Sequence, residues 1–185
     1  MKYKFCPKCG GRLKIKKAAF PRFWCLDCEF VFYQNSKPTA SALIIDGDKV
    51  LLGKRRINPS KGKWDIIGGF LEDGEHPEAG MKREVLEESG LRVRVIDRLD
   101  FIMDTYGAEK ESTLNITYIV KIRSGKMKPG DDISELRWFS IGKYPKNIAF
   151  KNGKQMLRDL KRWYSKRNIY VRSFPHSPRI KKLRN

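Results

Sequence analysis

The sequence of 185 residues predicts an α/β domain preceded by a small β module. Between residues 40 and 166, apolar strand-like runs alternate with two helical patterns, an order of elements typical of an α/β fold. Ahead of them, residues 3–33 are predicted to form short hairpins that carry two cysteine pairs. The chain length suits one ordinary domain and one small module. We therefore expect domains at residues 1–35 and 36–166, followed by a basic, flexible tail at 167–185.

The small module contains all four cysteines of the chain, as Cys6-Pro-Lys-Cys9 and Cys25-Leu-Asp-Cys28. Two Cys-x-x-Cys pairs at this separation predict a tetrahedral zinc site, and four thiolates would close the coordination shell in a structural role. Two disulfides or a redox Cys-x-x-Cys are the competing interpretations, but no β-α-β pattern surrounds either pair. Because no cysteine is left for a disulfide, we expect a reducing compartment and a cytoplasmic protein.

Aromatic residues are concentrated around the cysteine pairs. They could stack on nucleic-acid bases. A module of this size also needs them for its own small core or for contact with the larger domain, and we favour this packing role. The residues concerned are Phe20, Phe23, Trp24, Phe30, Phe32 and Tyr33.

The larger domain is expected to begin after a linker at residues 35–38 with two strands joined by a tight Asp-Gly-Asp turn. A loop and a short strand then lead into Gly68 and Gly69, whose lack of side chains allows a sharp turn. The predicted elements are strands at 40–46, 49–55, 64–67, 91–106, 113–122 and 135–141, and helices at 77–89 and 151–166. The second helix has an apolar stripe of Met156, Leu157, Leu160 and Trp163, which indicates core packing.

The helix at 77–89 carries the strongest chemical signal. Glu84, Glu87 and Glu88 are spaced three and four residues apart, which places them on one helical face. Carboxylates so close together repel unless a cation lies between them, and hard oxygen ligands suit Mg²⁺ or Mn²⁺ together with substrate phosphates. Arg83 is placed to hold a carboxylate, with Glu75 of the preceding loop as its candidate partner. The competing interpretation is a solvated acidic surface.

The segment from Gly69 to Leu91 resembles the Nudix box, G-x5-E-x7-R-E-U-x-E-E-x-G-U with U apolar. The resemblance implies an α/β/α sandwich around a mixed sheet, and a hydrolase that splits a nucleoside diphosphate linked to another group. It also implies that Glu84, Glu87 and Glu88 bind divalent metal. Every fixed position is met, by Gly69, Glu75, Arg83, Glu84, Val85, Glu87, Glu88, Gly90 and Leu91.

The small cysteine-containing module at residues 1–35 is expected to be a zinc ribbon. A zinc ribbon followed by a Nudix box is similar to the arrangement in NADH pyrophosphatases and in smaller, ADP-ribose pyrophosphatase-like Nudix proteins. The resemblance implies ADP-ribose or NAD(H) as substrate and a nucleoside monophosphate as product. One departure matters: residues 100–113, DFIMDTYGAEKEST, stand where NADH pyrophosphatases carry a motif close to SQPWPFPxS. This puts NADH selectivity in doubt. Tyr106 lies in this region and is a candidate for stacking on a base.

A further acid is expected as a metal ligand or base beyond the box. We favour Glu135 at the start of a strand, with Asp131, Asp132 and Glu111 as rivals. Two other activities stay open. One is hydrolysis of oxidised nucleoside triphosphates, and the other is binding of RNA or processing of its 5′ end.

The net charge of +19 is unevenly distributed. Residues 1–37 hold nine basic and two acidic side chains, and residues 143–185 hold fourteen and one, whereas residues 38–142 are close to neutral. Basic flanks would attract a polyanion such as RNA, but a lysine-rich solvated surface would look the same. The sequence shows no apolar run of membrane-spanning length and no signal-peptide pattern at its start, so no membrane partner is expected. A homodimer is a candidate assembly because many relatives dimerise.

Overall fold

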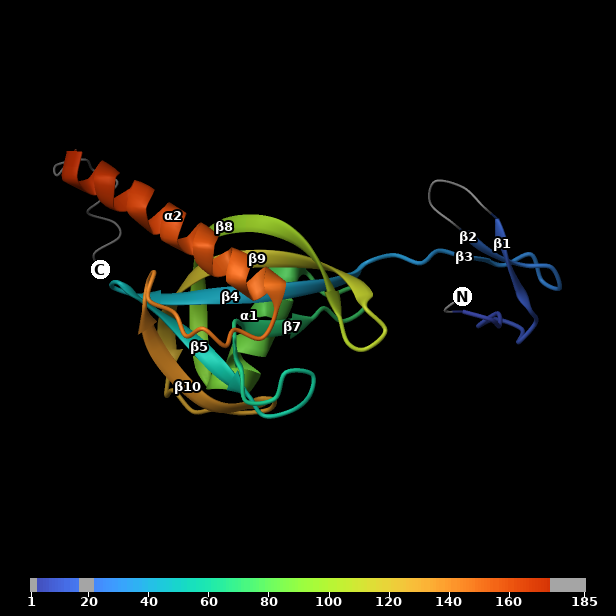
Figure 1. Cartoon of the computed structure of the whole chain (residues 1–185), viewed down its shortest axis with the longest axis horizontal. Helices are drawn as coiled ribbons and strands as arrows, with labels where there is room; N and C mark the ends of the chain where they lie inside the picture. The colour runs from blue at the N-terminus through green and yellow to red at the C-terminus, as the bar shows by residue number, and fades with distance from the viewer. Residues whose placement is uncertain (1–2, 17–21, 174–185) are drawn as a thin grey trace. The chain divides into compact units, whose positions relative to one another are not determined.

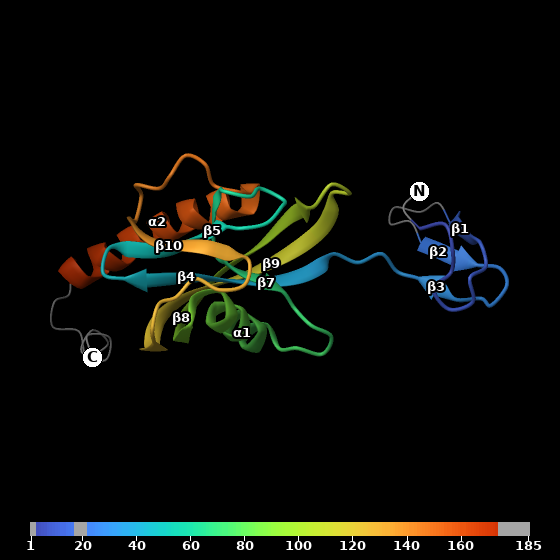
Figure 2. The ribbon, with the colours of Figure 1, turned by 90° about the horizontal axis from the view of Figure 1, so that it is seen from below.

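The computed structural model describes residues 3–16 and 22–173. The chain divides into two compact units, residues 1–36 and residues 37–185, which are drawn in Figures 1 and 2. Predicted tail residues 174–185, and Phe20 of the small module, lie outside the described residues.

The first unit, called here the ribbon, is a three-stranded antiparallel sheet in the order β1-β2-β3. Its strands are β1 (Leu13–Lys16), β2 (Arg22–Cys25) and β3 (Val31–Phe32). Successive side chains point to opposite faces of a strand, so Phe23 points inward and Trp24 points outward. The inner face forms a small core of Leu13, Phe23, Cys6 and Cys25, against which Tyr3, Phe30 and Phe32 pack.

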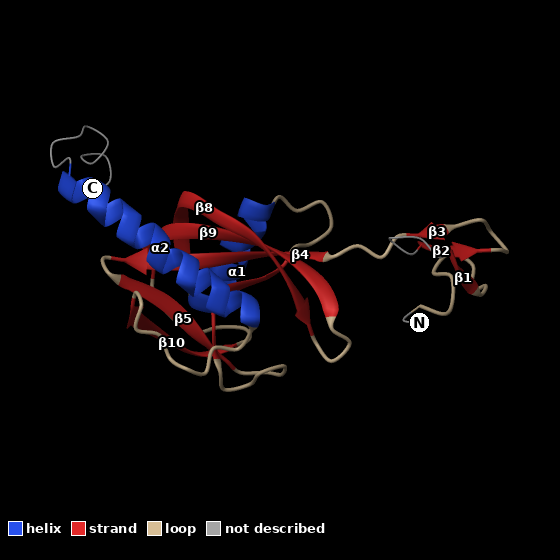
Figure 3. Cartoon of the chain, turned by 45° about the horizontal axis from the view of Figure 1, so that its top comes forward, coloured by secondary structure: helices blue, strands red, loops and turns tan. Residues whose placement is uncertain are grey.

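The second unit contains a seven-stranded sheet with two helices (Figure 3). Its strands are β4 (Lys37–Asp46), β5 (Lys49–Arg55), β6 (Trp64–Asp65), β7 (Ile67–Phe70), β8 (Leu91–Tyr106), β9 (Glu111–Gly125) and β10 (Ile133–Ser140). The strand expected at 64–67 is divided into β6 and β7 because the two halves pair with different neighbours, β5 and β4.

Strand β4 lies at the centre of the sheet. It runs parallel to β9 along one edge, and along the other it pairs antiparallel with β7 near its start and with β5 near its end. Seven consecutive residues of β4 are buried, as expected for a strand covered on both faces. This pairing brings the Gly68-Gly69 turn of β7 next to Ala40 and Ser41.

Helices α1 (Pro77–Ser89) and α2 (Lys151–Ser173) cover opposite faces of the sheet (Figure 2). Alternate side chains of β4 pack into the hydrophobic cores on the two faces of the sheet. Ala40, Ala42 and Ile44 join Met81 and Val85 of α1 in one core, whereas Leu43 and Ile45 join a second core with α2. The expected α/β/α sandwich around a mixed sheet, preceded by a small β ribbon, is therefore confirmed.

Helix α1 has well-defined ends. Its N-cap is His76, whose Nδ1 accepts a hydrogen bond from the Glu78 amide at 3.2 Å, and Pro77 occupies the first turn, where a missing N–H costs little. Gly90 ends the helix in the left-handed conformation, φ +70°, and its amide bonds the carbonyl of Leu86. His76 thus has a local structural role.

Helix α2 is longer than the expected 151–166. No proline or glycine interrupts the sequence between Gly153 and Pro175, and the helix continues to Ser173. Residues 167–173, expected to begin the tail, therefore form its last turns. Within the described part of the chain, no helix is long and apolar enough to cross a membrane.

Candidate active site and metal centre

A cavity of about 250 Å³ opens in the second unit, beside the Gly68-Gly69 turn. Its lining includes a group of acids, Glu84 and Glu88 of α1 and the loop residues Asp131 and Asp132. Liquid water occupies roughly 30 Å³ per molecule, so the cavity can hold a ligand group several times larger than water. The cavity is further lined by Thr39, Ser41, Arg55, Asp65, Ile66, Gly68, Gly69, Phe70, Glu72, Asp104, Thr105, Tyr106, Thr113, Asn115, Phe150, Asn152, Gly153 and Met156.

The glycine turn positions the two glutamates. The Gly68 amide donates to Glu88 Oε2 at 3.0 Å, and Gly68 has φ +144°, a conformation that L side chains rarely adopt. A Cβ on Gly68 would lie 2.3 Å from the Ala40 carbonyl oxygen, and one on Gly69 would lie 2.5 Å from Glu84 Oε1. Only glycine fits at position 68, because the contact there is with backbone, whereas a Cβ at position 69 would displace the Glu84 carboxylate.

Arg83 links three carboxylates beside the cavity. Its Nε and Nη2 donate to the two oxygens of Glu75, both at 2.9 Å, which is the bidentate geometry expected of a strong arginine–carboxylate pair. Its Nη1 donates to Glu84 at 2.9 Å and to Glu87 at 3.1 Å. Nη2 also bonds the Phe70 carbonyl, so the guanidinium ties the loop to α1. The expected Arg83–Glu75 pair is present.

Burial gives the site unusual protonation behaviour. Desolvation raises the pKa of Glu88 from 4.5 to about 8, aided by the negative charges of Glu84, Asp65 and Asp131. Desolvation also raises the pKa of Glu84. The hydrogen bonds from Arg83 act in the opposite direction and lower the pKa of Glu75 to about 2. Ionising both Glu84 and Glu88 is thus unfavourable unless a cation compensates the negative charge.

The structure does not bring all the expected acids together. Glu84, Glu88, Gly69 and Tyr106 line the cavity, whereas the half-exposed Glu87 is directed to Arg83. Among the described residues, the only group of cysteine, histidine or acidic side chains whose ligand atoms all lie within 4.8 Å is the cysteine set. The three glutamates share the expected helical face without converging on one point.

Glu135, the favoured further acid, lies away from the cavity on β10. It pairs with Arg137 and, at 3.4 Å, with Lys54. Desolvation raises the pKa of Glu135, but the hydrogen bonds and positive charges of Arg137 and Lys54 together outweigh it and lower that pKa. Its rivals Asp131 and Asp132 do line the cavity, on the loop before β10, and Arg56 bonds both of their carbonyls. The position of the acids therefore favours this loop pair over Glu135. The remaining rival, Glu111, pairs with Lys37.

The cavity lining also contains Arg55 and Asp65, which the sequence alone did not single out. Arg55 donates from Nε to the Pro59 carbonyl at 2.8 Å and from Nη1 to Asp65 at 3.2 Å. Its Nη2 is buried and has no hydrogen-bond partner among the residues that the structure describes. Burial raises the pKa of Asp65 to about 6 despite the Arg55 charge. A buried donor beside a cavity indicates a contact for a ligand acceptor.

Aromatic rings also line the cavity. Tyr106 lies between Phe70 and Phe150, with ring centroids 5.3 and 5.6 Å away, and Arg55 lies 5.0 Å above Phe150. On the sheet beneath, Asn115 accepts from Thr39 at 2.6 Å and donates to Thr113 and to the Ile102 carbonyl. Apart from Tyr106, the sequence did not single out these residues, because the pairing of β4, β8 and β9 brings them together from distant segments.

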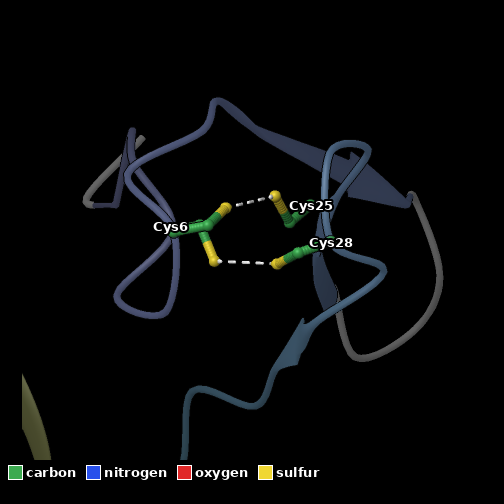
Figure 4. A group of neighbouring side chains, drawn as sticks. Cys6, Cys25 and Cys28 are labelled. Carbon is green, nitrogen blue, oxygen red and sulfur yellow. Dashed lines mark hydrogen bonds between the residues drawn. The ribbon is translucent and has the colours of Figure 1, made fainter.

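The ribbon holds the second candidate metal centre. The four cysteine sulfurs lie within 4.8 Å of one another, and Figure 4 shows Cys6, Cys25 and Cys28 directed toward a common centre. Amides of Lys8 and Gly11 each approach a cysteine sulfur at 3.4 Å, which stabilises thiolates. Four soft sulfur donors at tetrahedral spacing fit Zn²⁺, in agreement with the predicted closed structural site.

Comparisons with known proteins agree with this description. Residues 35–160 match the family described as "NUDIX domain", and residues 4–34 match the zinc-ribbon family described as "Nudix N-terminal". An ADP-ribose pyrophosphatase of Methanocaldococcus jannaschii is 32% identical over 135 residues, covering 73% of this chain and 79% of that protein. A human NAD-capped RNA hydrolase is 38% identical over 102 residues, which span 50% of this chain and 22% of that protein. The crystal structure of a NUDIX hydrolase from Nitrosomonas europaea superimposes with a TM-score of 0.74 and 30% identity, covering 90% of this chain and 93% of that one.

Proposed function

Because the chain belongs to the Nudix hydrolase family, we propose that it is a Mg²⁺-dependent pyrophosphohydrolase acting on a nucleoside diphosphate linked to another group. ADP-ribose or an NAD(H)-like dinucleotide is the substrate we favour, with a nucleoside monophosphate as one product. The relative named ADP-ribose pyrophosphatase supports this choice because its match extends over 79% of its length. The cysteine site supports a reducing, cytoplasmic location, since zinc needs free thiolates.

One observation carries the proposal: a single cavity is lined by both acidic and aromatic side chains. Glu84 and Glu88 are among the acids, and Tyr106 and Phe150 supply rings beside the cation Arg55. A nucleotide joined through a pyrophosphate has the matching form, with a charged phosphate centre flanked by a flat base or a sugar. Aromatic faces suit the base, and the unpartnered Nη2 of Arg55 suits a substrate oxygen.

The acids that line the cavity fit a hard divalent cation. Their donor atoms are carboxylate oxygens, and the raised pKa values of Glu84 and Glu88 reflect burial and mutual repulsion that a cation would relieve. When bound, Mg²⁺ would neutralise charge on the pyrophosphate and lower the pKa of water. Glu84, Glu87 and Glu88 are the proposed ligands, and Glu87 would have to exchange its contact with Arg83 for the cation.

The protein residues have distinct proposed roles. Arg83 and Glu75 orient the glutamate helix against the loop, and the Gly68 amide fixes one oxygen of Glu88. Asp131 or Asp132 is positioned to accept a proton from the attacking water, because both line the cavity. Such catalysis depends on positioning and charge stabilisation rather than on a covalent intermediate.

A substrate screen tests the proposal. The zinc-loaded protein would be incubated with Mg²⁺ and ADP-ribose, NADH, NAD, dinucleoside polyphosphates, oxidised dGTP or NAD-capped RNA, and phosphate release would be measured after phosphatase treatment. We expect a clear preference for ADP-ribose or a dinucleotide. Release of pyrophosphate from oxidised dGTP as the fastest reaction would favour the triphosphate-cleaving alternative. Absence of turnover on every compound would contradict the proposal.

NAD-capped RNA is a second candidate substrate. It contains the same pyrophosphate as NAD, and the match to a human NAD-capped RNA hydrolase together with the basic flanks favours it. The screen separates the two cases, because an RNA-directed enzyme would cleave the capped RNA faster than free NAD at low salt, and the advantage would shrink as salt is raised.

Replacing Gly69 by alanine is expected to lower kcat by roughly ten- to a hundredfold, because the new Cβ would collide with the Glu84 carboxylate at 2.5 Å and displace it. Steady-state kinetics of Gly69→Ala, Glu84→Gln and the double variant measure the effect. If the alanine acts through Glu84, the double variant is little slower than Glu84→Gln alone. Full additivity of the two losses would contradict this explanation.

The pKa of Glu88 predicts that Mg²⁺ binding depends on pH. Below a pKa of about 8 the Glu88 carboxyl of the folded protein holds a proton, which Mg²⁺ must displace. The affinity for Mg²⁺ should therefore rise between about pH 6.5 and 8. Calorimetry in two buffers would detect the proton that is released on binding. The raised pKa of Glu88 also means that, between pH 4.5 and about 8, the metal-free folded protein binds more protons than the unfolded chain. The stability of the metal-free protein should therefore fall as pH rises through this range. A pH-independent Mg²⁺ affinity would contradict the assignment of Glu88 as a ligand.

A further inference from the structure

The outward face of the ribbon sheet carries apolar and basic side chains together. In the paired register, Lys14, Trp24 and Val31 form one row across β1, β2 and β3. Beside this row, Arg22 lies over the Tyr33 ring, with its guanidinium carbon 5.3 Å from the centroid. We define the outer ribbon face as Arg12, Lys14, Arg22, Trp24, Val31 and Tyr33.

Packing within the ribbon does not account for these exposed rings. The inner face already has a core, in which Tyr3, Phe23 and Phe32 contact one another at centroid separations of 4.6–6.0 Å. Trp24 and Tyr33 remain 43% and 56% exposed within the described structure. Adjacent exposed apolar side chains on a small unit mark an interaction surface more often than a packing defect. The aromatic residues of the ribbon thus divide into a core set and an outward set.

The charge of the outer ribbon face identifies the kind of partner. Its three cations, Arg12, Lys14 and Arg22, take part in none of the ion pairs found among the described residues. The acids of the ribbon lie in the turn segment that contains the second cysteine pair, where Asp27 approaches Gly11. A face with only positive charge would repel a second copy of itself and attract a polyanion.

We propose that the outer ribbon face binds a single-stranded polynucleotide. Trp24 pairs with Val31, and Tyr33 follows the end of β3 two residues after Val31, a diagonal placement of about 7–8 Å if the strand geometry continues, so each ring can receive its own base. Stacking is available only where bases are unpaired, and Arg12, Lys14 and Arg22 would contact the phosphates on either side. This binding does not depend on the proposed hydrolase function, and it involves no base-edge readout, so sequence preference is weak.

The test measures binding without turnover. A labelled, mixed-sequence 12-nucleotide RNA strand would be titrated with the full zinc-loaded chain at low salt, and fluorescence anisotropy would give Kd. We expect Trp24→Ala and Tyr33→Ala each to raise Kd fivefold or more, and Trp24→Phe to retain most of the affinity, because a ring still presents a stacking face. The matched control is Leu26→Ala, which removes a 48% exposed apolar side chain from the cysteine turn.

Further arms of the experiment separate stacking from general charge attraction. Replacing Arg12, Lys14 and Arg22 together by glutamine should flatten the dependence of log Kd on log salt by about two units, near 0.7 for each lost phosphate contact. Comparable affinity for a DNA strand of the same sequence would fit stacking, whereas stronger binding of the matching duplex would overturn the proposal. Binding that survives Trp24→Ala/Tyr33→Ala, with zinc content unchanged, would reside elsewhere on the chain and would also overturn it.

Discussion

Replacing Glu88 by glutamine is expected to reduce kcat on the preferred substrate by a hundredfold or more while the protein stays folded. Glu88 is 6% exposed, lines the cavity and has one oxygen fixed by the Gly68 amide. Glutamine keeps the shape of this side chain but removes the negative charge that would hold a cation against the pyrophosphate. Losing such preorganised charge stabilisation typically costs two to three orders of magnitude in rate.

The matched control is Glu78→Gln in the first turn of the same helix. Glu78 pairs with Lys82 at 2.6 Å and is not among the cavity residues, so its loss should change kcat little. Glu87→Gln should resemble Glu88→Gln if Glu87 joins the metal ligands, although its present partner is Arg83. Nearly full activity of both Glu87→Gln and Glu88→Gln, at saturating Mg²⁺, would contradict the proposed metal site.

Replacing Cys25 by serine is expected to remove zinc from the ribbon, lowering the metal content from about one ion per chain to nearly none. Cys25 is fully buried beside Leu13 and Phe23 in a core too small to be stable alone. Structural zinc sites contribute about 10–16 kcal/mol of apparent binding free energy, which becomes folding free energy of such modules. The ribbon should therefore unfold, which loss of near-ultraviolet dichroism and faster proteolysis within residues 1–36 would report.

The second unit should remain folded in Cys25→Ser, because its two hydrophobic cores contain no ribbon residue. Calorimetry should retain the main unfolding transition. Leu26→Ser, at the exposed neighbouring position, should keep its zinc. A Cys25→Ser protein that still binds one zinc ion with unchanged ribbon stability would contradict a four-cysteine structural site.

Features that depend on residues close together in the sequence could be predicted, whereas features created by the pairing of distant strands could not. The helix at 77–89 and its bond between Arg83 and Glu75 follow from spacing, a proline start and a glycine end within one short segment. The cysteine cluster is similarly determined by two short motifs. By contrast, Arg55 and Asn115 look ordinary in sequence and enter the cavity only because β4 pairs with β5 and β9.

The disposition of the acids shows the same limit. Helical spacing placed Glu84, Glu87 and Glu88 on one face and also Arg83 four residues before Glu87, but it could not decide that Glu87 would pair with Arg83 rather than line the cavity. Likewise, Glu135 looked well placed at the start of a strand, yet β10 directs it toward Arg137 and Lys54. Such cases depend on which of several possible partners each side chain contacts: Arg137 lies on the same strand as Glu135, whereas Lys54 is brought to it by the pairing of β10 with β5.

The most direct test of the central claim is to identify the products of ADP-ribose hydrolysis with Mg²⁺ in ¹⁸O-labelled water, using wild-type protein and Glu88→Gln in parallel. The account predicts AMP and ribose 5-phosphate in equal amounts, with one ¹⁸O incorporated into one of them, and at least a hundredfold less of both from the variant. Intact ADP-ribose after prolonged incubation with folded, zinc-loaded protein, or equal product formation by Glu88→Gln, would contradict it.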